Sequence, residues 1–436
     1  MKRLSVHIAA TALLTLLSLT ARADGAATST SPYSKFGVGN LCRSGTVYTN
    51  GMGKIGTATR DNRFINIMNP ASVTARDSLS LMSEFSVSQQ NVYFRQDDLS
   101  SVDNTFNINN LTMSFPIWKS SAMMFGLNPY SCVNYSIVDN ITDPQTIGYT
   151  GSAVDYYTGE GGLYQIYVAA GATFFKRLSV GAEFDYFFGD IAKTFTREFS
   201  SSSFSSLCSD AEVTLSGCTG KFGLQYEQPL GKNRSLVFGG TYRLAARMTR
   251  GSNTAVTYRT QSSVLDTLSC SFPSIDNVCI PSEWSVGVSY KHKDKWRAEV
   301  NYTQSDWTTS GMNGIKGLSE TYFATKTSRS VNAGFEIVPN RNDIRYYMKR
   351  CSYRVGAYWT DEYYTCKGNN ISSVGITLGM SLPIWRWYNA LSVAVDFGQR
   401  SNFNDPFADG LIRERYVNFS VAINIFDIWF VKPKYE

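Results

Sequence analysis

Histidine and long hydrophobic runs are both scarce in this chain of 436 residues. It has two His, of which only His292 lies beyond the N-terminal segment. A Ser–His hydrolase site and a zinc site built on His ligands are therefore excluded. After the N-terminal stretch, no segment is apolar enough to span a membrane as a helix, which needs about 20 such residues. No Gly-rich phosphate loop with a Lys is present, so the sequence predicts no enzyme, cofactor or metal site.

The N-terminus has the pattern of a secretory signal peptide at residues 1–23. Lys2 and Arg3 form a charged start, an apolar core follows, and Ala21-Arg22-Ala23 is a small-x-small cleavage site. The mature chain should therefore begin at Asp24. An uncleaved membrane anchor is the alternative, but the apolar run is shorter than a spanning helix needs. No basic run stands out in the rest of the chain, so no nucleic-acid partner is predicted.

All eight Cys lie in the part that would be exported, and an even number in an oxidising compartment indicates disulfides. Two local bridges are expected, each closing a polar segment of a predicted outer loop: Cys208–Cys218 and Cys270–Cys279. If Cys351 and Cys366 share one strand they should not pair, because 15 residues at about 3.3 Å each hold them far apart. The sequence assigns no partners to the remaining four: Cys42, Cys132, Cys351 and Cys366.

Alternating polar and apolar stretches run through the chain from about residue 78. In residues 179–186, the polar Ser179, Glu183 and Asp185 share one face and four apolar side chains share the other. This period of two suits a strand between a wet lumen and lipid. The pattern predicts fourteen strands, at 78–95, 104–118, 121–138, 160–175, 178–198, 210–228, 234–250, 282–291, 295–306, 328–338, 350–364, 371–385, 388–400 and 412–426.

The connections between these segments fall into two kinds. Short turns, such as Phe175–Leu178, follow the even strands, and long Ser/Asn/Asp-rich loops are expected after the odd ones. This segregation is typical of outer-membrane barrels, with short turns in the periplasm and long loops outside. A soluble two-sheet sandwich is the alternative, but strands of this length count against it. The sequence thus predicts an all-β, 14-stranded antiparallel transmembrane β-barrel at residues 77–436, integral to the outer membrane of a Gram-negative bacterium and surrounded by its lipid.

Residues 24–76 lack this alternation and are rich in Gly, Ser, Thr and Asn. The segment is too short for a domain, so we expect it to form an N-terminal hatch, or plug, inside the barrel. Asn69-Pro70-Ala71 near its end should form a turn, because Asn initiates turns and Pro fixes φ.

The third predicted strand contains Asn128-Pro129. A Pro inside a strand removes a ladder N–H and is tolerated only at an edge or a bulge. Because a closed barrel has no free edge, Pro129 should force a kink or gap in the wall. The gap could be a lateral passage into the lipid phase, or an ordinary bulge in the extracellular part of the strand; spacing alone leaves both open.

These features together resemble the FadL/TodX outer-membrane transport family, whose members are fourteen-stranded barrels with an N-terminal hatch. The resemblance rests on Asn69-Pro70-Ala71 before the first strand and on the third-strand Pro129. The start at Ser31–Gly39, which includes Phe36, looks like the Bacteroidota branch. The resemblance implies a hatch positioned by Asn69, Pro70 and Ala71, and a third-strand gap at Asn128 and Pro129.

The resemblance also implies a function. Studied members of the family pass long-chain fatty acids or other hydrophobic compounds, so uptake of a small hydrophobic ligand with lateral release to the bilayer is the leading expectation. The alternative is a non-transporting accessory or scaffold subunit of an outer-membrane machine, such as one for β-barrel assembly or type IX secretion. Eight Cys and long outer links depart from the transporter pattern and suit a docking surface for other subunits.

Overall fold

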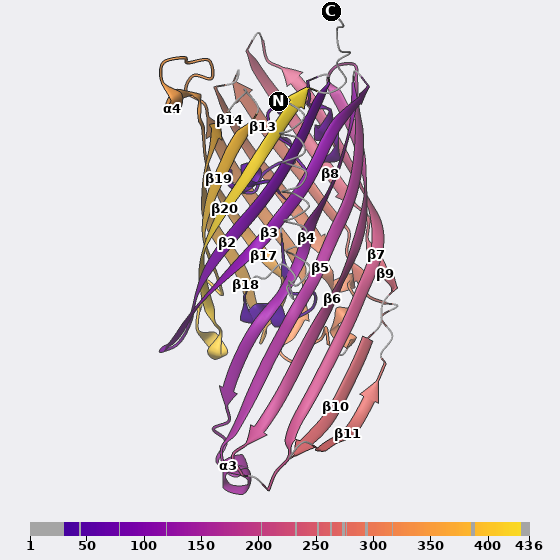
Figure 1. Ribbon diagram of the computed structural model, residues 1–436, viewed down its shortest axis with the longest axis vertical. Helices are drawn as coiled ribbons and strands as arrows, with labels where there is room; N and C mark the ends of the chain where they lie inside the picture. The colour runs from indigo at the N-terminus through magenta and orange to yellow at the C-terminus, as the bar shows by residue number, and fades with distance from the viewer. Residues whose placement is uncertain are drawn as a thin grey trace, which may run out of the picture.

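The computed structural model describes residues 30–428, except 43–44, 78, 119, 202, 232, 251–252, 262–263, 273–274, 276, 293–294, 316 and 385–388. The expected signal peptide lies outside these residues. Within them, fourteen strands form a closed antiparallel barrel (Figure 1), which confirms the predicted fold. In barrel order these are β2 (Ser80–Gln96), β3 (Leu99–Trp118), β4 (Ser121–Asn140), β5 (Ala153–Phe174), β6 (Leu178–Phe199), β7 (Ser206–Pro229), β8 (Arg234–Arg243), β13 (Glu283–His292), β14 (Trp296–Asp306), β16 (Thr327–Ile337), β17 (Ser352–Cys366), β18 (Asn369–Pro383), β19 (Ala390–Ser401) and β20 (Arg413–Ile428).

Shorter elements lie at the two ends of the barrel and inside it. Those before β2 are η2 (Pro32–Lys35), β1 (Asn40–Leu41), α2 (Val47–Asn50) and η3 (Pro70–Thr74). The outer loops carry α3 (Pro144–Thr150), β9 (Ala246–Arg250), β10 (Asn253–Gln261), β11 (Val264–Ser271), β12 (Cys279–Ile280), η4 (Trp307–Thr309), η5 (Met312–Gly314), β15 (Phe323–Thr325) and η6 (Ala408–Gly410). On the periplasmic side, α4 (Tyr347–Arg350) follows β16.

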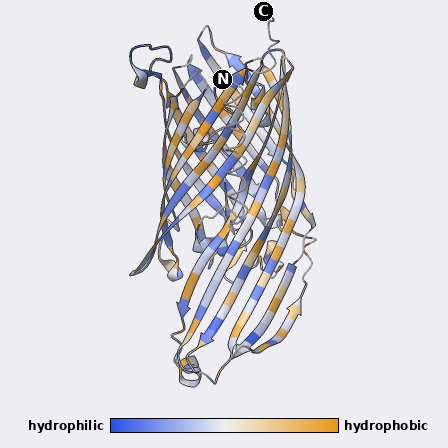
Figure 2. Cartoon of the chain, viewed as in Figure 1, coloured by the Kyte–Doolittle hydropathy of each residue, from blue (hydrophilic) through white to orange (hydrophobic). Residues whose placement is uncertain are grey.

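The ring closes where the first barrel strand meets the last. β2 pairs with β20 from Ser80–Ile428 to Arg95–Arg413. Side chains alternate across the wall as the sequence predicts: Glu183 and Asp185 are buried toward the lumen, whereas Phe184 between them is 56% exposed on the outer face. Figure 2 shows the same alternation of hydrophobic and hydrophilic residues along the strands of the barrel. Within the described residues, no helix combines the length and the apolar character needed to cross a membrane.

Two outer connections are tighter than the sequence predicts. β2 and β3 are joined through Asp97 and Asp98, and β17 and β18 through Lys367 and Gly368, so neither link is a long loop. Asp97, Lys367 and Gly368 adopt positive φ, as tight hairpin turns require. The strands here run beyond the stretch of clear apolar alternation, because outside the membrane no lipid requires an apolar face.

The wall is not of even height. β4, β5, β6 and β7 have 20 to 24 residues, whereas β13, β14 and β16 have 10 or 11. A strand needs only about 9–11 residues to cross the bilayer. The four long strands, extended by β10 and β11, therefore continue past the rest of the barrel on the outer side and carry α3 at their tip (Figure 1). We call this part the outer extension.

The barrel and the outer extension should respond differently to a charge on their outer faces. We expect Phe184→Arg to lower the free energy of unfolding by about 2–4 kcal/mol, because it places a guanidinium in lipid. Val138→Arg is the matched control, since Val138 is equally exposed at 56% but lies on the extension, and its effect should stay within about 0.5 kcal/mol. Denaturant titrations of the two variants folded into lipid vesicles measure both values. Equal effects would contradict the assignment of the lipid belt.

Candidate functional site at the opening between β3 and β4

The wall is interrupted between β3 and β4. These strands pair from Trp118–Ser121 to Leu111–Leu127, and there the pairing ends. Beyond that point β3 stays with β2, while β4 stays with β5 up to Asn140. Figure 1 shows the β2–β3 hairpin separating from the outer extension. We call the unpaired stretch, residues 99–110 of β3 and 128–140 of β4, the seam.

Pro129 lies at the start of the seam. The β4–β5 register shifts between Pro129 and Ser131, so that Tyr130 is the extra residue of a bulge. Pro129 has no N–H with which to continue the ladder toward β3. The buried Asn128 next to it donates to the Pro129 carbonyl at 3.3 Å and lies 3.5 Å from Gln165 Oε1. Both predicted gap residues are therefore at the point where the wall pairing stops.

Three glycines that sequence reasoning did not single out extend this irregularity across the next two strands. Gly161 and Gly162 on β5 and Gly189 on β6 have positive φ, and the β5–β6 pairing is interrupted between Gly161–Ile191 and Tyr164–Phe188, in an unchanged register. A Cβ on Gly189 would lie 2.0 Å from the Gly162 carbonyl oxygen, so the backbones approach too closely for any side chain. The Gly-Gly pair within an expected strand was the signal that could have located this bend.

The free edge of β4 is covered from inside the barrel. Residues 30–77, which we call the luminal segment, run along it. β1 pairs with β4 at Asn40–Cys132 and Leu41–Ser131. Two further backbone bonds extend this contact, from Cys42 N to Tyr130 O (2.8 Å) and from Ser31 N to Asn134 O (3.0 Å). The luminal segment thus supplies hydrogen bonds to β4 that β3 does not.

The predicted turn Asn69-Pro70-Ala71 rests on the inner face of β5, β6 and β7, the strands that follow β4 in the ring. The fully buried Asn69 side chain accepts from Ala71 N at 3.0 Å and donates to Thr57 O at 2.7 Å. A Cβ on Gly223 of β7 would lie 2.1 Å from Asn69 Oδ1, and one on Gly181 of β6 would lie 2.4 Å from the Pro70 carbonyl carbon. The wall therefore needs glycine where this turn contacts it.

A buried ion cluster holds the luminal segment at the periplasmic end. Arg63 Nη2 lies 2.6 Å from Asp61 and 3.0 Å from Glu336 of β16. Arg297 of β14 also bonds to Asp61. Burial by itself raises the pKa of the Asp61 carboxyl, but the guanidinium groups of Arg63 and Arg297 hold that pKa well below its ordinary value. The four charges balance, which makes their burial tolerable.

An apolar cluster closes the outer end of the lumen. Phe36, the predicted hatch residue, is fully buried and stacks on Phe323 at 5.4 Å between ring centroids. Tyr363 donates to the carbonyl oxygens of Phe36 (3.1 Å) and Gly39 (2.7 Å), and Trp307 packs on Tyr363 at 4.5 Å. Outer loops and luminal segment thus form one packed core at the barrel mouth.

Between this cluster and the ion cluster lies a cavity of about 340 Å³ that reaches Asn128, Pro129 and Tyr130. Its lining is mostly polar and includes seven ionisable side chains with formal charge: Lys54, Lys221, Arg243, Glu283, Glu362, Asp396 and Arg400. The outer rim of the seam is apolar instead. Phe106, Ile108, Leu111 and Leu127 are all exposed there, at 40% or more. The seam therefore joins a hydrophilic interior to a hydrophobic outer face.

The expected disulfides need correction. Cys208 and Cys218 lie on the single strand β7, ten residues apart. At about 3.3 Å per residue their Cα atoms are roughly 33 Å apart, far beyond the reach of a disulfide. Cys270 and Cys279 are not bonded to each other in the structure, in which all eight cysteines are free thiols, and Cys279 Sγ donates to Thr309 O at 3.2 Å. The error arose because a long strand of polar alternation was interpreted as an outer loop.

A family model described as BamG matches residues 4–436. The chain belongs to the BamG family. The sequence matches no curated protein. The fold is similar to that of three solved structures, which share 10–13% sequence identity with the chain.

The first is a monoaromatic hydrocarbon channel, CymD, with a TM-score of 0.59 and 13% identity over 89% of this chain and 98% of that one. The second is the Ralstonia pickettii toluene transporter TbuX, with a TM-score of 0.58 and 13% identity over 90% and 98%. The third is a Pseudomonas aeruginosa FadL homologue, with a TM-score of 0.58 and 10% identity over 89% and 99%. The barrel fold predicted from the sequence is thus shared with these transporters.

The ion cluster leads to a prediction for stability. Asp61→Asn removes one of the two carboxylates that face Arg63 and Arg297, so two buried guanidinium groups are left with one carboxylate. We expect the free energy of unfolding to fall by about 3–5 kcal/mol. Asp266→Asn is the matched control, because its pair with Arg259 (3.4 Å) is exposed, and the loss should be at most about 1 kcal/mol. Guanidinium titrations followed by Trp fluorescence compare the two. A small loss in Asp61→Asn would mean that the cluster does not hold the luminal segment.

Proposed function

We propose that this BamG-family chain is an outer-membrane barrel that takes up small hydrophobic molecules and releases them sideways into the bilayer through the seam. The observation that carries the proposal is the end of β3–β4 pairing at Pro129, beside an apolar outer rim. The shared fold with hydrocarbon and toluene channels is consistent with it. The ligand class is fatty-acid-like or aromatic, and the surrounding partner is outer-membrane lipid.

The luminal segment acts as the hatch in this proposal. Asn69, Pro70 and Ala71 fix its base against the wall, and Phe36 fixes its outer end. A ligand enters among the outer loops by displacing part of the apolar cluster around Phe36. It then leaves past Asn128 and Pro129 toward the lipid, where each buried CH₂ contributes about 0.8 kcal/mol. Asn128 and Pro129 also line the polar cavity, so the ligand crosses only the edge of that cavity on its way to the lipid.

Replacement of Pro129 tests the route. In Pro129→Val the restored N–H lets β4 extend its pairing toward β3, so we expect uptake of a fluorescent fatty acid to fall toward the level of cells without the barrel. Pro116→Val is the matched control, since Pro116 lies on β3 opposite Ala122, where the two strands are paired and a bulge follows at residue 117, and it should leave uptake unchanged. Unaltered uptake in Pro129→Val, with a closed seam shown by its structure, would reject lateral release.

The interior of the barrel favours a second function, that of an accessory or scaffold subunit. A packed apolar core lies at the mouth, and the cavity behind the seam is lined by charged and polar side chains, so this cavity is not a preformed apolar pocket for transport. A closed barrel suits the accessory or scaffold subunit of an outer-membrane machine, for β-barrel assembly or type IX secretion. Such a subunit needs surfaces on which other subunits dock, not a passage.

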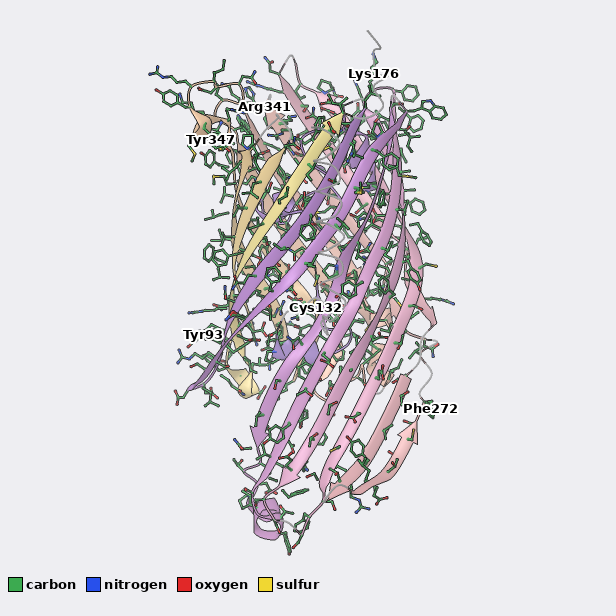
Figure 3. All side chains as sticks on the ribbon, viewed as in Figure 1. Tyr93, Cys132, Lys176, Phe272, Arg341 and Tyr347 are labelled. Atoms are coloured by element: carbon green, nitrogen blue, oxygen red, sulfur yellow. The ribbon has the colours of Figure 1, made fainter. Side chains whose placement is uncertain are left out.

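The periplasmic loop at residues 339–350 offers one such surface. Its apolar side chains project from the barrel, and Ile344 is completely exposed. The loop carries four basic residues and one acidic residue, and Asp343 accepts from the N–H groups of Arg345 and Tyr346 at 2.9 and 2.7 Å. Figure 3 labels Arg341 and Tyr347 at this end of the molecule. An ordered, basic and apolar loop fits an acidic periplasmic subunit.

Gentle detergent extraction followed by native mass spectrometry separates the two functions. A transporter gives a lone barrel that retains lipid or a hydrophobic ligand. A scaffold gives a stable assembly, and the double variant Ile344→Asp/Arg345→Glu should then lose subunits. Arg259→Glu, on the outer extension, should not. An assembly unaffected by the double variant would contradict docking at this loop.

The remaining assignments belong to the same proposal. The chain is exported by the segment 1–23 and resides in the outer membrane of a Gram-negative bacterium. The sequence at Ser31–Gly39 supports a member of the Bacteroidota branch. These statements rest on sequence patterns and stay predictions.

A further inference from the structure

Two cysteines meet where the luminal segment crosses the seam. Cys42 Sγ lies 3.0 Å from Cys132 Sγ, closer than two unbonded sulfur atoms normally approach. The first residue follows β1 and the second lies on the free edge of β4, 90 positions apart in the chain. Figure 3 labels Cys132 at the level where the outer extension begins. We propose that Cys42 and Cys132 form a disulfide that ties the luminal segment to the barrel wall at the seam.

The backbone around the pair is already arranged for a bond. The hydrogen bond from Cys42 N to Tyr130 O fixes one partner, and the pairing of Asn40 with Cys132 fixes the other. Gly39 has a φ of +85°, and a Cβ there would lie 2.3 Å from the Cys132 carbonyl oxygen. The two chains are therefore as close as backbones allow. A bond length near 2.05 Å needs the sulfur atoms to move together by only about 1 Å.

A covalent link has a clear physical role at this place. β1 contains two residues, so its ladder with β4 is short, and short isolated strand pairs are marginally stable. Among the described strands, β4 is the one that pairs with β1. A disulfide holds the luminal segment on the β4 edge whether the seam releases a ligand or is permanently closed, so the inference does not depend on the proposed function.

The chemistry is a thiol–disulfide exchange in the exported chain. Each thiol loses a proton, an S–S bond forms between Cys42 and Cys132, and two electrons reduce the disulfide of a periplasmic thiol oxidant to a dithiol. Cys132 is buried in the folded barrel. The exchange therefore takes place before the barrel closes, when both residues are accessible in an oxidising compartment.

Peptide mapping tests the link directly. Cells are treated with N-ethylmaleimide before extraction, so that free thiols are blocked and later oxidation is prevented, and the purified chain is digested without reductant. We expect one cross-linked species that joins the peptides of Cys42 and Cys132 and disappears on reduction. It should be absent in Cys42→Ser and in Cys132→Ser and present in Cys351→Ser. Both cysteines alkylated, or either joined to a different cysteine, overturns the proposal.

Thermal unfolding gives a second measurement. Reductant should lower the melting temperature of the natural chain and leave that of the Cys42→Ser/Cys132→Ser double variant unchanged. An equal shift in both proteins would mean that the reductant acts elsewhere and would contradict a stabilising link at the seam. Neither measurement depends on uptake or on other subunits. The disulfide can therefore be confirmed or rejected independently of the proposed function.

Discussion

A strand in a membrane barrel must pair its backbone on both sides, because lipid offers no hydrogen bonds to an open edge. This constraint governs the part of the molecule around Pro129. There the wall loses the contact between β3 and β4, and the edge of β4 pairs instead with a segment that runs through the lumen. The interior segment is therefore a structural member of the wall. Any movement of it would expose the backbone of β4.

The luminal segment is held by different interactions along its length. Near the periplasm, buried charges from Asp61 and Arg63 meet Arg297 and Glu336 of the wall. At its base, the turn at Asn69 lies directly on wall glycines. Near the outer mouth, aromatic packing around Phe36 takes over. The ion cluster lies at the periplasmic end of the luminal segment and the apolar packing at its outer end. The outer end can therefore be displaced without breaking the ion cluster. Either entry of a ligand or docking of a subunit from outside would require such a displacement.

The contrast between the two sides of the seam limits what the barrel can do. Its rim faces outward with exposed apolar side chains, whereas the cavity behind it is polar and charged. A hydrophobic molecule gains free energy along the rim, whereas the polar cavity behind it offers few apolar contacts. The outer extension, built by the bend at Gly161, Gly162 and Gly189, adds a large surface beyond the membrane that uptake alone does not require.

Local periodicity was enough to determine the fourteen strands, the direction of their faces and the break at Pro129, because alternation and the missing N–H of proline are properties of a few neighbouring residues. Periodicity did not predict two tight outer turns or the full length of β7, since outside the lipid no face of a strand has to be apolar. The wrong prediction of a Cys208–Cys218 disulfide has the same cause. The closed ring alone decided the long-range contacts. Asp61 and Arg297 are 236 positions apart, and Cys42 and Cys132 are 90 apart, so only the three-dimensional course of the luminal segment brings them together.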